Sequence, residues 1–303
     1  SRQYKQCLIG EFINGKIFNL EELCRSGKAR LREAQIEEAD LDAWYLLEYI
    51  TGVTKTAYYG NPKADVPEEQ AEEYEVALAK RAEHIPLQHI TGRQYFMGYE
   101  FLVNDQVLVP RQDTENLVEE AYRHIKEKLK KEPNKKVQVL DVCTGSGCIL
   151  LSLMKLCGQI EGTGVDISEG ALEVARQNGE RLKADAVFRK SDLFENVEGA
   201  YDIIVSNPPY IRTAVIEELA DEVKLHDPYI ALDGKEDGLY FYRKIIAQAG
   251  KYLKPGGWIL FEIGHDQAEE VSALLAQAGY DKIDVKKDLA GLDRVVSAMY
   301  NKG

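Results

Sequence analysis

The run Asn207-Pro208-Pro209-Tyr210 could hold a planar amino group, and it directly follows an apolar segment, residues 201 to 206. Prolines end a strand and stiffen the backbone, and they carry no N–H. The carbonyls of Asn207 and Pro208 therefore have no nearby donor, and with the Asn207 side-chain oxygen they can accept from one NH2 group. Tyr210 would supply a flat wall for that group. A simple proline turn with a capping Asn does not explain all four residues.

A second run, Cys143-Thr144-Gly145-Ser146-Gly147, follows the segment VQVLDV and precedes an apolar helix pattern. Glycines after the first strand of an α/β fold let a ligand approach the backbone. A dinucleotide fingerprint would need a third glycine where Leu150 stands, and no phosphate-binding Lys follows. Asp166 ends the next strand, where a carboxylate can accept both hydroxyls of a ribose. This combination favours S-adenosylmethionine as the cofactor.

Each part of this cofactor pattern has a simpler interpretation. Any strand-to-helix turn tolerates glycine, and an acid at a strand end is often a helix cap, as Asp166 would be before Ser168. Taken alone, either feature is weak evidence for a cofactor site.

The composition sets the class of protein. A chain of 303 residues allows one large or two modest domains, and 45% hydrophobic with 29% charged residues excludes disordered and fibrous proteins. The 38 basic and 51 acidic residues give a net charge of −13, which argues against extended nucleic-acid binding through a broad basic surface. Proteins or small molecules are the expected partners.

Targeting and redox signals are few. No apolar run approaches the roughly 20 residues of a membrane helix, so no membrane partner is expected. The amino terminus lacks an apolar core of signal-peptide length, and the five cysteines include no CxxC pair. These features predict a cytoplasmic chain with reduced thiols.

The first ninety residues predict a small helical domain. Asn19 with Glu22 fits a helix cap, and the helix should run to about Ala34. Further helices are expected before Gly52 and between Pro67 and Pro86. Residues 1 to 18 carry no clear pattern and stay unassigned. Periodicity places four aromatic residues mostly in the core: Trp44, Tyr45, Tyr58 and Tyr59.

The remainder predicts an α/β domain. Aromatic and β-branched residues from 94 to 109 read as a hairpin between domains. Strands and helices then alternate, which predicts a doubly wound parallel sheet, with a Pro255-Gly256-Gly257 turn before strand 258 to 263. Two late strands near 281 to 287 and 293 to 300 imply an antiparallel edge. The expected domains are a helical domain 19–92, a hairpin linker 93–110 and a Rossmann-like domain 111–303.

The sequence resembles the PrmC/HemK family of protein glutamine methyltransferases, which modify peptide-chain release factors. The resemblance covers roughly residue 20 to the end, and NPPY alone is shared with many amino-group methyltransferases. The segments VPRQDTE and DLAGLDRVV are specific to this family. Further matches are PLQHITGRQYFMGYEFLVNDQVL, DVCTGSG, EVKLHDPYIALDGKEDGLYFYRKI and FEIGHDQ.

The resemblance implies a class I S-adenosylmethionine-dependent methyltransferase whose helical domain docks a class 1 release factor. It implies that the glutamine of the GGQ motif lies on Asn207, Pro208, Pro209 and Tyr210, with Asn207, Pro208 and Tyr210 as the catalytic residues. It places the cofactor on Cys143, Thr144, Gly145, Ser146, Gly147, Asp166, Leu193 and Asn207. The family usually has Gly where this chain has Cys143, which puts cofactor affinity in question more than cofactor identity.

The chemistry needs orientation above all, because the lone pair of an amide nitrogen is delocalised into its carbonyl. Acceptors that hold both N–H groups would aim the nitrogen at a sulfonium methyl, without a metal or general base. The five histidines show no ligand spacing. An adenine N6-methyltransferase is the main alternative and would need a flipped base and a basic channel. A non-catalytic regulator would not need the intact turn.

Overall fold

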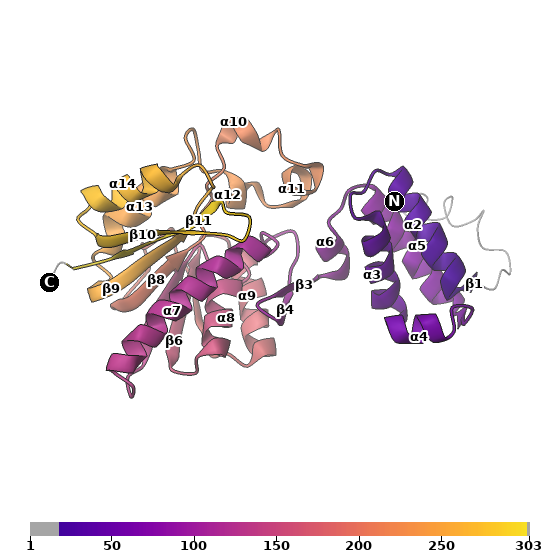
Figure 1. Cartoon of the computed structure of the whole chain (residues 1–303), viewed down its shortest axis with the longest axis horizontal. Helices are drawn as coiled ribbons and strands as arrows, with labels where there is room; N and C mark the ends of the chain where they lie inside the picture. The colour runs from indigo at the N-terminus through magenta and orange to yellow at the C-terminus, as the bar shows by residue number, and fades with distance from the viewer. Residues whose placement is uncertain (1–17, 302–303) are drawn as a thin grey trace. The chain divides into compact units, whose positions relative to one another are not determined.

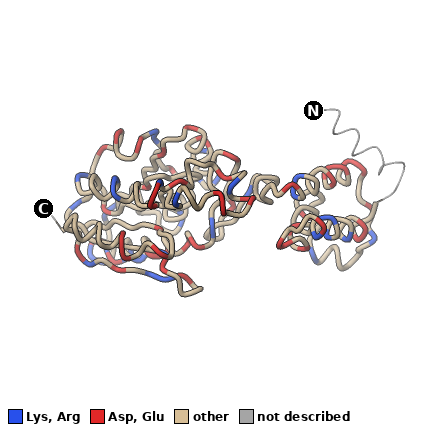
Figure 2. The backbone as a smooth tube through the Cα atoms, turned by 90° about the horizontal axis from the view of Figure 1, so that it is seen from above, with Lys and Arg blue, Asp and Glu red and all other residues tan. Residues whose placement is uncertain are grey.

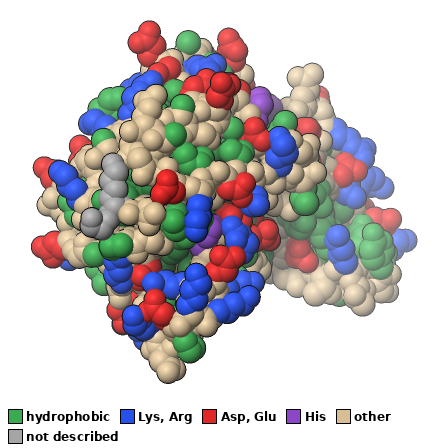
Figure 3. Space-filling view, turned by 60° about the vertical axis from the view of Figure 1, so that its left-hand side comes forward, with side chains coloured by type: hydrophobic (Ala, Val, Ile, Leu, Met, Phe, Trp, Pro, Cys, Tyr) green, Lys and Arg blue, Asp and Glu red, His purple; other side chains and the backbone are tan. Residues whose placement is uncertain are grey.

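The computed structural model describes residues 18 to 301, which divide into two compact units between Thr91 and Gly92. Residues 1 to 17, most of the unassigned amino-terminal segment, lie outside the described part. Of the helices described in both units, none is both long and apolar enough to cross a bilayer. Figure 2 shows acidic and basic residues interspersed along the chain, and the face seen in Figure 3 carries both kinds side by side.

The first unit is helical (Figure 1). Asn19 caps its first helix by accepting from the Glu22 N–H at 3.0 Å, and Gly52 ends the second in the left-handed conformation at φ +71°. Both predicted boundaries are confirmed. The helices are α2 (Leu20–Glu33), α3 (Ala39–Thr51), α4 (Lys55–Gly60), α5 (Glu68–Ala82) and α6 (Leu87–Thr91), with a two-residue strand pair, β1 (Phe18–Asn19) and β2 (Asp65–Val66).

Two of the aromatic residues predicted for the core of this unit are exposed instead. Trp44 is 7% exposed and Tyr58 packs against the core, whereas Tyr45 and Tyr59 are 42% and 79% exposed. Successive helical residues point about 100° apart, so Trp44 and Tyr45 cannot both face the same core. The prediction was wrong for Tyr45 and Tyr59.

The predicted hairpin forms from β3 (Arg93–Phe96) and β4 (Tyr99–Leu102), which pair antiparallel. Met97 and Gly98 have φ values of +51° and +77°, as a tight two-residue turn of type I′ requires. Phe96 and Phe101 are buried in the core of the second unit, so the hairpin groups with that unit.

A seven-stranded sheet forms the centre of the second unit, in the order β10-β11-β9-β8-β5-β6-β7. Within this sheet, the five strands that come first in the chain, β5 to β9, are parallel. The last two, β10 and β11, pair antiparallel at one edge, as predicted. The strands are β5 (Val137–Val142), β6 (Ile160–Asp166), β7 (Val187–Lys190), β8 (Tyr201–Ser206), β9 (Leu253–Glu262), β10 (Asp281–Lys287) and β11 (Asp293–Met299).

Helices cover both faces of this sheet (Figure 1). The helices α7 (Glu115–Lys131) and α8 (Cys148–Leu156) bury apolar residues in one core cluster with the hairpin. The other face packs against α13 (Tyr240–Ala249) and α14 (Ala268–Gln277). A 3-10 turn (Gln112–Thr114) precedes α7, and α9 (Glu169–Leu182) follows β6. This is the doubly wound, Rossmann-like arrangement that the sequence predicts.

The segment Pro255-Gly256-Gly257 is not a turn between elements but lies inside β9. The register shifts between Tyr201 and Ile203 of β8, so the extra residues of β9 bulge out of the ladder. Gly256, at φ +77°, still donates its N–H to Tyr300 O at 2.7 Å. Three short helices that the sequence patterns do not predict precede α13: α10 (Thr213–Ile216), α11 (Asp221–His226) and α12 (Tyr229–Leu232).

Candidate active site

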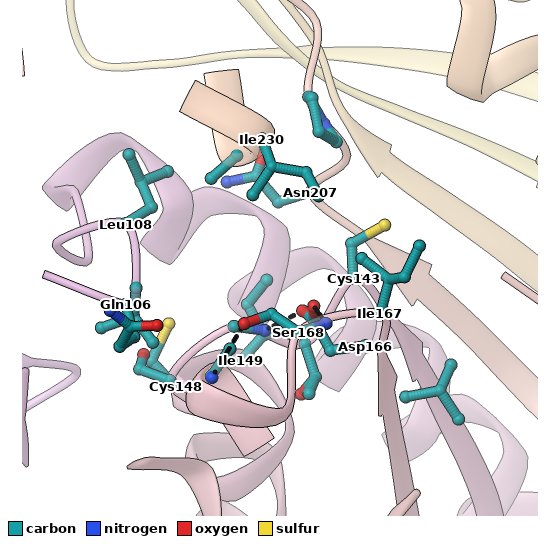
Figure 4. A pocket seen from close by; sticks show the side chains of 18 of the residues that line it. Gln106, Leu108, Cys143, Cys148, Ile149, Asp166, Ile167, Ser168, Asn207 and Ile230 are labelled. Atoms are coloured by element: carbon teal, nitrogen blue, oxygen red, sulfur yellow. Dashed lines mark hydrogen bonds between the residues drawn. The ribbon is translucent and has the colours of Figure 1, made fainter. Parts of the chain in front are cut away.

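The glycine loop and the Asn-Pro-Pro-Tyr turn meet because their strands are neighbours. The parallel strands β5 and β8 pair Val142 with Ser206, so Cys143 and Asn207 both emerge at the same edge of the sheet. Ligands of open α/β sheets bind at this carboxyl edge. Cys143 and Asn207 line one pocket of about 1040 Å³, counting the space open to solvent (Figure 4).

The loop has the left-handed backbone conformations typical of a ligand-binding loop. Cys143, Gly145 and Gly147 have φ values of +62°, +55° and +79°. A Cβ built on Gly145 would meet nothing within 4 Å, so the loop is open on that side. Thr144 fixes the loop from below by donating its hydroxyl to Asp141 at 2.7 Å.

Asp141 of β5 is a buried carboxyl behind the loop and is not among the predicted site residues. It is fully buried, and its second oxygen, Oδ1, has no hydrogen-bond partner among residues 18 to 301. Burial raises the pKa of Asp141 to about 7, although the Thr144 hydroxyl opposes this shift. The loop therefore rests on a carboxyl that titrates near neutral pH.

Asp166 lies at the end of β6 and lines the pocket. Its Oδ2 accepts from the Gly145 N–H and its Oδ1 from the Ser168 N–H, both at 2.9 Å. Figure 4 shows Asp166 beside Ser168. Burial raises the pKa of this carboxyl. The cap of α9 is Ser168, which accepts from the Ala171 N–H at 3.2 Å. Asp166 thus orders the loop, and each oxygen keeps acceptor capacity toward the pocket.

The turn presents only part of itself to the pocket. Asn207 and Pro209 line it, whereas Pro208 and Tyr210 do not. Among the described residues, no protein group hydrogen-bonds the Asn207 side-chain amide. Tyr210 instead donates its hydroxyl to Glu262 at 3.1 Å. Burial, and next the charge of Glu262, raises the pKa of the Tyr210 hydroxyl well above its usual range.

Leu193 lines the pocket next to Asp192, with its backbone at φ +51°. The rest of the wall contains residues that the sequence argument did not single out. Arg111 and Thr114 belong to the segment VPRQDTE, and Gln106 and Leu108 belong to the stretch VNDQVL before it. In the sequence, both segments point only to the family resemblance. The additional lining residues include Gln106, Leu108, Arg111, Thr114, Ile149, Ile167, Ser168, Ser191, Ile230 and Phe241.

These surroundings fit S-adenosylmethionine. The loop offers backbone that a ligand can approach closely, Asp166 offers carboxylate oxygens, and apolar side chains such as Ile167 and Ile230 offer surface for a flat heterocycle. No group of three or more His, Cys, Asp or Glu residues in the described part of the chain is placed to hold a metal ion.

Cys143 is the unusual residue of the loop. It is a free thiol, as are the other described cysteines, Cys24, Cys148 and Cys157; Cys7 lies outside the described residues. Burial, and then the nearby carboxylates of Asp166 and Asp141, raises the pKa of the Cys143 thiol well above its usual value. The thiol therefore stays neutral at physiological pH and is a poor nucleophile.

Comparison with known proteins gives the same two parts. Residues 22–92 match the model of the PrmC N-terminal domain, and residues 115–224 match the methyltransferase small domain. The catalytic domain of hMettl16, solved with a MAT2A 3′UTR hairpin, is 14% identical, has a TM-score of 0.55 and covers 78% of this chain and 83% of that one. At this identity the likeness concerns the fold alone.

Two relatives named release factor glutamine methyltransferase are much more similar in sequence. The protein from Agrobacterium fabrum is 39% identical over 274 residues, covering 90% of this chain and 94% of that protein. The protein from Clostridium acetobutylicum is 40% identical over 274 residues, covering 89% and 94%. The shared sequence spans both units and the pocket described above, and the chain belongs to the release factor glutamine methyltransferase family.

Proposed function

We propose that this protein transfers a methyl group from S-adenosylmethionine to the side-chain amide nitrogen of the glutamine in the GGQ motif of a class 1 peptide-chain release factor. The observation that carries the proposal is the convergence of two dissimilar loops on one pocket, through the pairing of Val142 with Ser206. One loop suits a nucleoside-like cofactor and the other suits a planar amide.

The cofactor would be held by the loop Cys143, Thr144, Gly145, Ser146 and Gly147, by Asp166 and by Leu193, with Asn207 at the methyl-bearing end. When bound, it supplies an electrophilic sulfonium methyl. Asp166 is already oriented by the backbone N–H groups of Gly145 and Ser168, so its free lone pairs can accept from ribose hydroxyls without a rotamer change.

The substrate amide would be held by Asn207, Pro208, Pro209 and Tyr210. The Asn207 side chain has no protein partner in the described chain, so its oxygen is free to accept one N–H of the glutamine amide, and the Pro208 carbonyl can accept the other. Two fixed acceptors orient the nitrogen and stabilise the positive charge that develops on it. The excess proton can leave after transfer.

The helical domain, residues 19–92, would dock the release factor, the hairpin 93–110 would join it to the catalytic part, and residues 111–303 would carry the chemistry. The helical unit has its own hydrophobic core, including Leu46, Leu47, Tyr74 and Leu78. An independent core is what a separate docking module requires.

The experiment is co-expression with a release factor, followed by peptide mass spectrometry. The GGQ peptide should gain the mass of one CH2 group, with fragment ions that place it on the glutamine. The Asn207→Ala variant is the matched control and should modify a much smaller fraction of the peptide in the same time. An unmodified peptide with the wild-type enzyme, together with methylated adenine in added DNA or RNA, would replace the proposal by the nucleic-acid alternative.

A further inference from the structure

The Asn-Pro-Pro-Tyr turn cannot anchor itself, because two of its four residues lack an N–H. Its amino-terminal side is fixed by β8, where Ser206 pairs with Phe261 and donates its hydroxyl to Val142 O at 2.6 Å. An acceptor pair that must aim an amide nitrogen needs its other side fixed as well. That other side is Tyr210.

Glu262 fixes the side chain of Tyr210. It is the last residue of β9 and only 3% exposed, and its Oε1 accepts the Tyr210 hydroxyl at 3.1 Å. The backbone of Glu262 is held in turn, since the Tyr242 hydroxyl donates to Glu262 O at 2.8 Å. A buried carboxyl on a central strand is a rigid acceptor, so the phenol ring of Tyr210 has little freedom to rotate.

Gln267 fixes the backbone of the same residue. Its amide nitrogen donates to Tyr210 O at 3.0 Å and to Gly238 O at 3.3 Å, while its Oε1 accepts the Gly264 N–H at 2.9 Å. Gln267 is 3% exposed, and all of these partners are backbone groups. The Gln267 side chain therefore links the backbone of Tyr210 to the segments that contain Gly238 and Gly264.

Two glycines allow this close packing. A Cβ on Gly238 would lie 2.4 Å from Tyr210 O, and one on Gly234 would lie 2.7 Å from Tyr210 Cα. Both contacts are to backbone, which cannot swing away. The segments DGKEDG and FEIGHDQ contain none of the candidate site residues, yet both converge on Tyr210.

We propose that Glu262 and Gln267 are positioning residues for methyl transfer. They hold Tyr210 from its hydroxyl and its carbonyl, and so fix the far side of the turn whose Asn207 and Pro208 oxygens orient the substrate amide. This inference rests on the proposed function of the turn, and neither residue touches the reacting atoms.

The first test measures release-factor methylation in four variants. Tyr210→Phe and Glu262→Ala should each lower kcat about tenfold, the effect of losing one hydrogen bond at a cost of about 1.4 kcal/mol. Calorimetric cofactor affinity should change less than threefold. Glu262→Gln keeps an acceptor oxygen and should restore most of kcat. Gln267→Glu keeps the acceptor for Gly264 but loses the donor to Tyr210, and should again lower kcat about tenfold.

A double-mutant cycle separates positioning from general destabilisation. Glu262→Ala in a Tyr210→Phe background should cost no further activity, because the shared hydrogen bond is already gone. A further tenfold loss in that background would overturn the proposal, as would a Glu262→Gln enzyme no better than Glu262→Ala. Tyr210→Phe removes a single hydroxyl, so it covers the case in which Glu262→Ala does not fold.

A readout without substrate distinguishes this inference from the proposed function. With 3-fluorotyrosine incorporated at position 210, the fluorine resonance should be sharp in the wild-type and Glu262→Gln proteins and broadened or shifted in Glu262→Ala. Identical spectra would refute the positioning of Tyr210 by Glu262, even if the enzyme is active. A clear spectral difference in an enzyme that leaves the release factor unmodified would support the positioning of Tyr210 by Glu262 and refute the proposed function.

Discussion

The glycine loop and the proline turn occupy equivalent places, each following a central parallel strand, yet their backbones are opposite. In the loop, three residues have positive φ, and Gly145 donates its N–H to Asp166. In the turn, Pro208 and Pro209 carry no N–H, so the backbone of these two residues can only accept. The carboxyl edge of the sheet thus places the donors and open space of the loop beside the acceptors of the turn.

The two also differ in how they are held. The loop is held by residues near it in the chain. Thr144 donates to Asp141, three residues before Thr144, and Gly145 donates to Asp166 at the end of the next strand. The turn is held from afar, by Glu262 and Gln267, more than fifty residues along the chain. Glycine can supply the unusual conformations itself, whereas a proline turn depends on its neighbours for hydrogen bonds. Substitutions in the two regions should therefore fail in different ways.

The largest expected effect is on the turn. Asn207→Ala should lower the single-turnover rate at saturating cofactor by about 10² to 10³, as for loss of one preorganised transition-state partner. The thermal midpoint should move little, because the Asn207 amide has no protein partner in the described chain. A rate within about threefold of wild type, under 1 kcal/mol in barrier, would refute the acceptor mechanism.

Next comes the carboxylate of the loop. Asp166→Ala should weaken S-adenosylmethionine binding by about 1.5 to 3 kcal/mol, since it removes hydrogen bonds to a charged group. Calorimetry measures this affinity directly. Asp166→Asn is the control, because it keeps an acceptor for the Ser168 N–H and should lose less. Unchanged affinity in the alanine variant would remove Asp166 from the cofactor site.

The loop glycines should differ from each other in stability. An alanine at Gly147, φ +79°, would meet Leu151, Phe188 and Ala175 at 3.1 to 3.3 Å, whereas one at Gly145 meets only open space. Gly145→Ala should cost about 1 kcal/mol of strain, and Gly147→Ala about 2 kcal/mol once overpacking adds to it. Urea unfolding gives both values. Equal losses would contradict the packing difference.

The smallest effect is expected at Cys143. Its φ of +62° favours glycine, so Cys143→Gly relieves about 1 kcal/mol of strain but adds a similar entropy cost to folding. Net stability should change by less than about 1 kcal/mol, and methylation should persist. The measurements are unfolding midpoint and activity. Complete loss of activity with an intact circular dichroism spectrum would mean that the thiol has a role beyond packing.

The sequence by itself determined most of the elements, because their signals are local. The cap at Asn19, the stop at Gly52 and the turn at Gly98 each depend on the residue's own conformational preference or on partners within a few residues. The strand predicted for 137 to 142 has those bounds in the structure, since its apolar residues are buried on both faces. The runs 143–147 and 207–210 were likewise readable as candidate site segments.

Only the tertiary structure decided what these segments meet. The sequence does not say that β8 pairs beside β5, that the bulge at Pro255 stays within β9, or that Tyr45 faces outward. Nor does it connect Glu262 and Gln267 to Tyr210, because strand order and burial arise from contacts between distant residues. Local preference selects a conformation, whereas the position of a side chain relative to another strand depends on how the whole core packs.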